Sequence, residues 1–408
     1  MLHIQTGKQK NTVKLILSAI VFFITFAITM RELSFRSTDF QAHLDFALNI
    51  RKECLKITTS VSDFSFQLTY PLWHILVNVC YKISRFIFGT GMSPSYSAAF
   101  VTGLVNVCTY LIITKILSLY ACARAEWIAF GLCFVEPVYI PGLMDDFSFF
   151  AQGSPVIWHN PTNMIVKPFA LAGFFLIIQH LRKIQDGSGV SRKESFGLSA
   201  VIFLSVLAKP SFFQGFVPAL GVYILAQLCR TKFRLFREYC LLCSCFIPGF
   251  LIILGQFVIS FLYVKSGQGI GIGWLEVAKA YYPYPLLQLF LVLAFPICYI
   301  LFFVRTIGKT LEIRLSVLYV LCAWLEFALL YEKGERKFQG NFEWAVCLAY
   351  AVIWTVASML FFKDRSSKSS ENKGEKAKNI VLSLIWLLHF LSGLFFVWKM
   401  FTVEKLFF

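Results

Sequence analysis

The chain has 408 residues, of which 58% are hydrophobic, 17% are aromatic and only 15% are charged. This composition excludes a soluble enzyme and predicts an all-α polytopic membrane protein, because apolar runs of about 18 residues or more are typical of transmembrane helices. The net charge of +16 does not indicate a nucleic-acid partner. Most basic residues stand in short loops between the apolar runs, where they act as orientation signals.

The apolar runs predict about eleven transmembrane helices. The first run is followed by Arg31 and Glu32 without a small-residue cleavage site, so we interpret it as a retained helix rather than a signal peptide. Lys209 and Pro210 separate the fifth run from the sixth, because proline breaks the helical hydrogen-bond ladder. The predicted spans are residues 13–30, 95–118, 124–143, 163–181, 196–208, 211–229, 239–264, 286–304, 314–331, 344–362 and 380–399.

The apolar stretch 71–86 is not counted as a span. His74, Asn78, Lys82 and Arg85 interrupt it at helical spacing. This pattern predicts one water-facing stripe on an interfacial helix that lies in the headgroup plane. A twelfth span here would also place the most basic loops on the outer side of the membrane, against the positive-inside rule.

With the N-terminus inside, residues 1–408 form one transmembrane domain, which we expect in the cell (plasma) membrane. The first outer loop, 31–94, carries the interfacial helices, and segment 363–378, rich in Ser, Lys and Glu, is typical of a flexible cytoplasmic linker. We expect the functional site on the outer side, because loops on a rigid scaffold carry most binding and catalytic residues. The other outer loops are residues 144–162, 265–285 and 332–343.

The first outer loop contains Asp39 and His43 in a short polar segment. Thr38 and Gln41 predict a capping box at the start of a helix, so the cap does not require the Asp39 carboxylate. Asp39 and His43 then share one packed face of that helix, whereas Asp45 lies on its wetter side. We predict Asp39 as a catalytic base assisted by His43. The alternative is that Asp39 only stabilises the helix N-terminus and His43 covers the membrane interface.

The second outer loop contains Asp145 and Asp146, at the end of the third predicted span. By themselves they are consistent with a solvated helix end. A cleft between the first two outer loops would make them catalytic partners of Asp39, either around a cation or as part of a base–electrophile pair. A divalent metal therefore stays open as a cofactor.

The outer loops also supply candidates for substrate binding. Trp158 would stack on a sugar ring while His159 and Asn160 bond its hydroxyls, or the segment would only anchor the membrane interface. Lys167 and Lys209, each ahead of a proline, would bind phosphate as point charges, or would only snorkel to lipid headgroups. Further candidates are His74 of the interfacial helix and, in the last outer loop, Arg336 and Lys337, as a diphosphate clamp or a solvated loop, and Asn341.

The order of these features is similar to that of a known group of enzymes. A first span leads to an outer loop with Asp39 near its start and then to an interfacial helix that opens with Tyr-Pro-Leu-Trp-His at 70–74. Two spans joined by a basic inner turn follow, and then the loop with Asp145 and Asp146. This order resembles the GT-C superfamily of integral-membrane glycosyltransferases, in the class of protein O-mannosyltransferases and aminoarabinose transferases. The resemblance covers roughly residues 1–180 by architecture, and the stretch 158–162 looks like that of uncharacterised bacterial members.

This resemblance implies a polyprenyl-phosphate-linked sugar donor, used at the outer face in cell-envelope polysaccharide assembly. Asp39 matches the first-loop aspartate that deprotonates the acceptor in the family, and Asp145 or Asp146 matches the second-loop acidic residue. The chain lacks the double proline that relatives carry in the interfacial helix. It also lacks their large C-terminal soluble domain, which implies a small lipid or glycan acceptor rather than a folded protein.

The leading hypothesis is therefore a membrane glycosyltransferase in which Lys209 and Arg336 hold the leaving phosphate. Two alternatives stay open. An O-antigen-type polysaccharide polymerase or ligase would keep its key residues in a large late outer loop, whereas here the first outer loop is the longest. A transporter or flippase would carry charges near mid-membrane and broken helices in two related halves. The sequence offers few such charges, with Glu136 and Glu326 as candidates, and no internal repeat.

Overall fold

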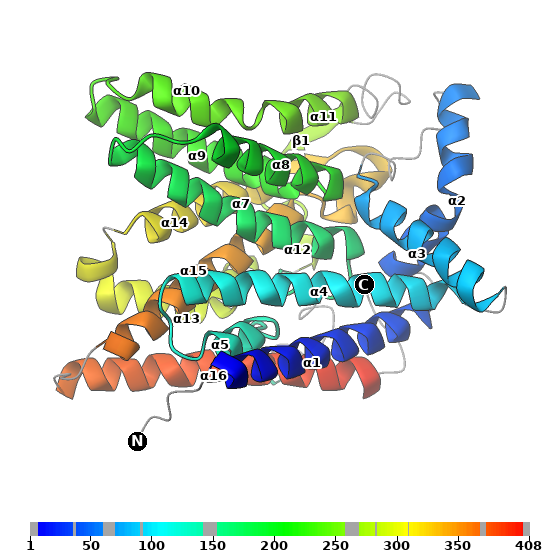
Figure 1. The fold of residues 1–408 in the computed structure, drawn as a ribbon, viewed down its shortest axis with the longest axis horizontal. Helices are drawn as coiled ribbons and strands as arrows, with labels where there is room; N and C mark the ends of the chain where they lie inside the picture. Colours follow the sequence, from blue (N-terminus) through cyan, green and yellow to red (C-terminus); the bar gives the residue numbers. More distant parts are fainter. Residues whose placement is uncertain are drawn as a thin grey trace.

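The computed structural model describes residues 7–35, 38–59, 70–89, 93–141, 153–257, 269–281, 284–308, 310–367 and 373–402. Most helices run along one direction and form a bundle (Figure 1). The helices are α1 (Gly7–Leu33), α2 (Asp39–Thr59), α3 (Leu72–Phe88), α4 (Pro94–Leu119), α5 (Ala125–Leu132), α7 (Pro161–Gln185), α8 (Arg192–Ala208), α9 (Ser211–Arg230), α10 (Phe236–Ser244), α11 (Ile247–Phe257), α12 (Ala278–Tyr281), α13 (Pro285–Ile307), α14 (Leu311–Leu329), the 3₁₀ helix η4 (Gly334–Gln339), α15 (Glu343–Ser367) and α16 (Lys373–Thr402).

The described part of the chain contains seven helices that are long and apolar enough to cross a membrane. These are α1, α4, α7, α9, α13, α15 and α16, and the bent pair α10–α11 makes an eighth candidate. Helix α15 runs through the interior, with 94% of its apolar window buried, whereas only 28% is buried in α1 and in α16. The prediction of an all-α polytopic membrane protein is confirmed, while the number of spans and their orientation stay predictions.

The structure differs from the predicted span 124–143. Helix α5 ends at Leu132 after eight residues, a turn at 133–134 follows it, and residues 135–140 have no regular secondary structure. Pro137 supplies no amide donor there, and the backbone N–H groups of Glu136 and Val138 donate to carbonyls of α16 and α13. The segment is therefore held by tertiary hydrogen bonds in place of helical ones.

Two other predicted spans are not among the seven helices that are long and apolar enough to cross a membrane. Helix α8, which contains the predicted span 196–208, has only 17 residues, and α14 carries Glu312, Arg314 and Glu326. The predicted span 239–264 is bent by 50° between α10 and α11, where Pro248 follows the break. In the predicted linker 363–378, α15 continues to Ser367 and α16 begins at Lys373, so its described ends are helical.

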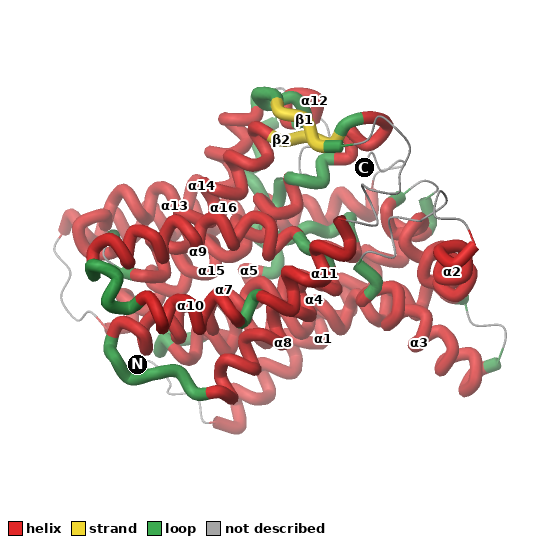
Figure 2. The backbone as a smooth tube through the Cα atoms, turned by 90° about the horizontal axis from the view of Figure 1, so that it is seen from above, coloured by secondary structure: helices red, strands yellow, loops and turns green. Residues whose placement is uncertain are grey.

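Helix α2 stands across the direction of α1 and α4 in Figure 1, and it is seen end-on in Figure 2. Helix α3 packs against it. This arrangement agrees with the prediction that residues 31–94 contain helices that do not belong to the spanning bundle. The water-facing stripe of α3 was wrong at two of its four positions, because His74 and Asn78 are buried against α2, with the Asn78 side chain donating to Ala47 O at 2.6 Å. Lys82 and Arg85 are exposed as predicted, together with apolar residues such as Ile75 and Leu76.

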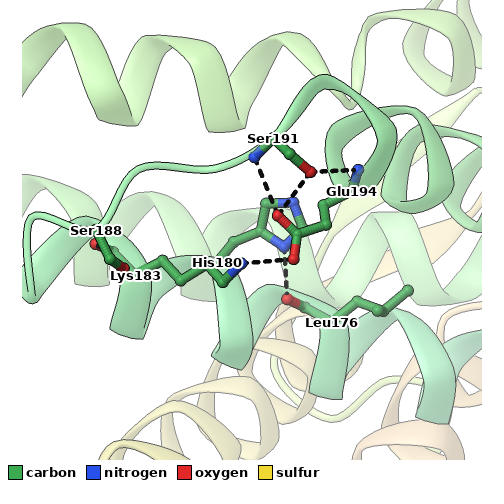
Figure 3. A network of polar contacts seen from close by, with 6 residues as sticks. All are labelled: Leu176, His180, Lys183, Ser188, Ser191 and Glu194. Carbon is green, nitrogen blue, oxygen red and sulfur yellow. Dashed lines mark hydrogen bonds and ion pairs between the residues drawn. The ribbon is translucent and has the colours of Figure 1, made fainter.

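A tight connection joins α7 to α8 (Figure 3). Ser191 caps α8 in a capping box with Glu194, and Lys183 on α7 forms an ion pair with Glu194 at 2.5 Å. His180 bonds Leu176 O within α7 at 2.8 Å. Because the two helices are fixed as a hairpin, the start of α7 and the end of α8 return to the same end of the bundle, near α2 and α3. We call this the α2–α3 end.

A short antiparallel ladder joins two connections at the α2–α3 end. Strand β1 (Ile270–Ile272) pairs with β2 (Leu330–Glu332), with Gly271 opposite Tyr331. A Cβ on Gly271 would stand 2.4 Å from the Tyr331 ring. This close packing fixes the register of the ladder.

Candidate functional site

Helix α2 begins as the sequence predicted. The Thr38 hydroxyl accepts a hydrogen bond from Gln41 N at 3.2 Å and donates to Glu32 O at 3.2 Å. The Gln41 side chain donates to Asp45 at 3.4 Å, so the described hydrogen bonds complete only the Thr38 half of the capping box. Because Thr38 provides the cap, the Asp39 carboxylate can form a tertiary contact instead.

Asn160 joins Asp39 to Lys209. Its side-chain N–H donates to Asp39 Oδ2 at 2.8 Å, and its Oδ1 accepts from Lys209 Nζ at 3.3 Å. The same Oδ1 caps α7 by accepting from Asn163 N at 2.9 Å and from the Thr162 hydroxyl at 2.8 Å. These donors fix the amide orientation, because an oxygen must face them and the NH₂ group must then face Asp39.

Lys209 lies in the break between α8 and α9. Its backbone is extended, with φ −173° and ψ 138°, and its N–H donates to Ser205 O at 2.9 Å. The ammonium group lies 4.5 Å from the centre of the Trp344 ring and 5.6 Å from that of Tyr70. All three side chains are buried, so the cation sits in an aromatic setting that stabilises positive charge.

His159 completes what we call the polar cluster, which consists of Asp39, His159, Asn160 and Lys209. Its ring is buried and lies 5.4 Å from the Trp344 ring. Burial lowers the pKa of His159 to about 4, against an opposing effect of the Asp39 charge and with a further lowering by Lys209. The imidazole is therefore neutral at neutral pH and lies within electrostatic range of both charged groups.

A histidine pair lies beside the polar cluster, between α2 and α3. His43 Nδ1 and His74 Nε2 are 2.9 Å apart, and both rings are buried. Burial lowers the pKa of His43 well below its usual range, and His74 and Lys209 lower it further. Burial also lowers the pKa of His74 to about 4. The described contact of His43 is therefore with His74, and the predicted assistance of Asp39 by His43 stays a prediction.

An apolar groove of about 1150 Å³ lies between α3, α4, α7 and α8. This volume exceeds the range of about 300–1,000 Å³ common for small-molecule sites. Two of its lining residues stand near the polar cluster in sequence: Ile165 follows Asn160 by five residues and Leu204 precedes Lys209 by five, roughly 7–8 Å along each helix. Residues lining the groove include Leu72, Leu76, Phe100, Ile165, Phe169 and Leu204.

Two of the predicted substrate-binding residues face the bundle interior instead. Trp158 is 2% exposed and packs against Phe134 and Phe396, so neither face of its ring is open to a sugar. Lys167 is buried, and its Nζ donates to Val156 O at 2.5 Å. The sequence placed Lys167 near the membrane surface, but the loop ahead of α7 covers it.

Among the hydrogen bonds that the structure describes, none joins residues 332–343, predicted as the last outer loop, to the polar cluster. Lys337 pairs with Glu276 at 3.1 Å, and Asn341 donates to Glu332 at 2.6 Å. Both contacts brace the connections around β1 and β2. Arg336 lies in η4, but its side chain is not among those that the structure describes.

Asp145 and Asp146 lie outside the described residues. Within the described ranges, no three His, Cys, Asp or Glu side chains come together as metal ligands would. The described residues therefore offer no ligand set for the divalent metal that the sequence left open.

Sequence reasoning missed Tyr70 and Trp344 as neighbours of Lys209. Trp344 was counted as the first residue of an apolar span, and Tyr70 stood only in the motif that opens the interfacial helix. The available signal was an aromatic residue at the start of a helix near a lysine–proline break. Such aromatics usually mark the membrane interface, so composition alone favours that reading.

No protein-family model matches the chain, and no curated protein matches it in sequence. Fold and composition define a multi-pass helical membrane protein. At one end of its bundle a carboxylate, an amide and an ammonium group form one hydrogen-bonded series, next to an apolar groove.

Proposed function

We propose that the protein is a glycosyltransferase that moves a sugar from a polyprenyl-phosphate donor to a lipid or glycan acceptor at the outer face of the cell membrane. The observation that carries the proposal is the Asp39–Asn160–Lys209 series. It brings a carboxylate on α2, which would act as the base, close to an ammonium group at the α8–α9 break, which would bind the phosphate. The resemblance to the GT-C superfamily supports the same assignment of Asp39.

The apolar groove supports a long-chain lipid as the carrier of the sugar. A polyprenyl chain needs an apolar surface that continues up to a site for its charged phosphate. The groove and the polar cluster meet these two needs, because α7 and α8 contribute to both. The phosphate would lie near Lys209, whose ammonium group is a compact positive charge that attracts the phosphate oxygens.

The proposed reaction is a single displacement at the anomeric carbon. Asp39 accepts the proton of the acceptor hydroxyl while that oxygen forms a bond to the anomeric carbon. The bond between the anomeric carbon and the phosphate oxygen breaks, and its electron pair leaves with the polyprenyl phosphate. Lys209 stabilises the negative charge that develops on this leaving group. One displacement inverts the anomeric configuration.

The test uses the full chain in liposomes, a panel of undecaprenyl-phosphate sugars and a matched pair of variants. Asp39→Asn removes the base but keeps the size of the side chain, whereas Asp45→Asn changes an exposed carboxylate one and a half turns later on α2. We expect Asp39→Asn to abolish sugar transfer and Asp45→Asn to retain it, with both variants folded. Full activity of Asp39→Asn would remove Asp39 as the base.

Two other outcomes would contradict the proposal as a whole. Movement of the lipid-linked sugar across the membrane without a covalent product would indicate a flippase. Growth of a chain from lipid-linked repeat units would indicate a polymerase. Both can be read in the same liposomes, by the accessibility of the sugar and by product length.

A further inference from the structure

The His43–His74 contact is one of two described polar links between α2, which carries Asp39, and α3, which lines the apolar groove; the other joins Asn78 to Ala47 O. The nitrogen atoms are 2.9 Å apart, with exposed fractions of 8% for His43 and 2% for His74. Trp73 packs edge-on against His43, at 6.3 Å between ring centres. His43 lies one helical turn after Asp39, so the contact with His74 fixes the part of α2 that carries the Asp39 carboxylate.

The groups around the histidine pair determine which ring nitrogens carry a hydrogen. A hydrogen bond to the backbone of Tyr70 raises the pKa of His74, so the His74 ring donates to it, and the donor is Nδ1 because Nε2 faces His43. Neutral His74 then accepts at Nε2 from the Nδ1–H of His43. A first added proton binds at His43 Nε2 and leaves the Nδ1–H···Nε2 hydrogen bond in place. A second proton, at His74 Nε2, leaves two N–H groups facing each other.

We propose that His43 and His74 form a positioning clamp: the neutral pair holds α2 against α3, and thereby Asp39 against Asn160, and protonation of the pair in acid releases α2. The effect of the clamp on catalysis rests on the proposed function, whereas its effect on the packing of α2 does not. Neither histidine need touch the substrate. Both are positioning residues for Asp39.

The charged groups around the pair set the direction of its response to acid. Burial of both rings disfavours their protonated forms, and Lys209 acts further against protonation of His43. Asp39 favours protonation of the nearby His159, and Glu32, buried at the end of α1, interacts with the Asp39 charge. Burial therefore keeps the pair neutral at neutral pH.

The pH window follows from the pKa values of the folded and unfolded states. An unfolded histidine titrates near 6.5, whereas the pKa of His74 in the folded protein is about 4. The unfolded or released form therefore binds more protons as the pH falls from about 6.5 to about 4. Stability of the closed clamp is complete above this window and declines through it.

Hydrogen exchange of the full chain in detergent tests the clamp without any substrate. After correction for intrinsic rates, we expect exchange in residues 39–50 to rise reversibly between pH 6.5 and 4, while α4, which contains no histidine, stays protected. The variant His74→Gln places an amide oxygen where Nε2 accepts and does not titrate. We expect its α2 to stay protected across the window.

The expected catalytic results are equally specific. His74→Gln should transfer sugar at neutral pH at the wild-type rate and keep its activity in acid, whereas His74→Leu should lose activity at every pH. A wild-type α2 that exchanges independently of pH, or a His74→Gln protein with the same acid response as wild type, would overturn the clamp. So would a His74→Gln protein with a protected α2 but no activity at neutral pH, because His74 would then contact the substrate. If no donor gives transfer, the proposed function fails while the exchange result still decides the clamp.

Discussion

At the scale of single residues, Asn160 has two roles that can be separated. One oxygen caps α7, and the NH₂ group of the same amide holds Asp39. The sequence predicted Asn160 as a sugar-binding residue, from a motif of Trp, His and Asn. The sequence could not show that the Asn160 amide bonds to other protein groups rather than to a sugar. An asparagine at a helix start can cap the helix or bind a ligand equally well.

We predict that Asn160→Ser and Asn160→Ala separate these roles. Serine retains a capping oxygen but cannot reach Asp39, so Asn160→Ser should unfold at the wild-type temperature and lose sugar transfer. Asn160→Ala loses the cap as well, at a cost of about 1 kcal/mol, and should unfold at a lower temperature. Thermal unfolding in detergent and transfer assays measure the two effects. Wild-type activity in Asn160→Ser would mean that Asp39 does not depend on this contact.

At the scale of elements, the non-helical segment 133–140 takes the place of a predicted helix. It depends on close contact with α16, where a Cβ on Gly393 would stand 1.4 Å from Phe134 O. The predicted span 124–143 is mostly apolar, and a buried irregular segment can be as apolar as a helix. The signals of a break were Pro137 and Pro141, together with the charge of Glu136.

Gly393→Ala should therefore destabilise the protein strongly, because the added methyl group cannot fit against backbone that is held on two sides. Gly221→Ala in α9 is the matched control, since nothing lies within 4 Å of its added Cβ. We expect Gly221→Ala to unfold at or above the wild-type temperature and Gly393→Ala well below it. Equal unfolding temperatures would show that α16 does not pack on this segment.

At the scale of the whole molecule, the apolar groove and the polar cluster share α7 and α8. The bundle returns Asp39, Asn160 and Lys209 to one end although they are far apart in sequence. The α7–α8 hairpin is one reason, because its cap and ion pair fix the two helices in register. The same two helices therefore line the groove and carry Asn160 and Lys209 at their ends.

A bulky residue in the groove should impair long-chain donors selectively. Leu76 lines the groove, whereas Ile75, its neighbour on α3, is similarly exposed and is not among the lining residues. We expect Leu76→Trp to raise the KM for an undecaprenyl donor several-fold with little change for a ten-carbon analogue. Ile75→Trp should change neither. Equal effects of Leu76→Trp on both donors would place the lipid chain elsewhere.

The sequence by itself determined the membrane class, the cap at Thr38, and the packed position of His43 against the exposed position of Asp45. Composition and helical spacing suffice for these features, because they depend on local geometry and on transfer from water. Only the tertiary structure decided that His74 and Asn78 face α2, that Lys167 points inward, and that Asn160 links Asp39 to Lys209. A polar side chain can be satisfied by water or by a buried partner, and spacing along one helix cannot distinguish the two.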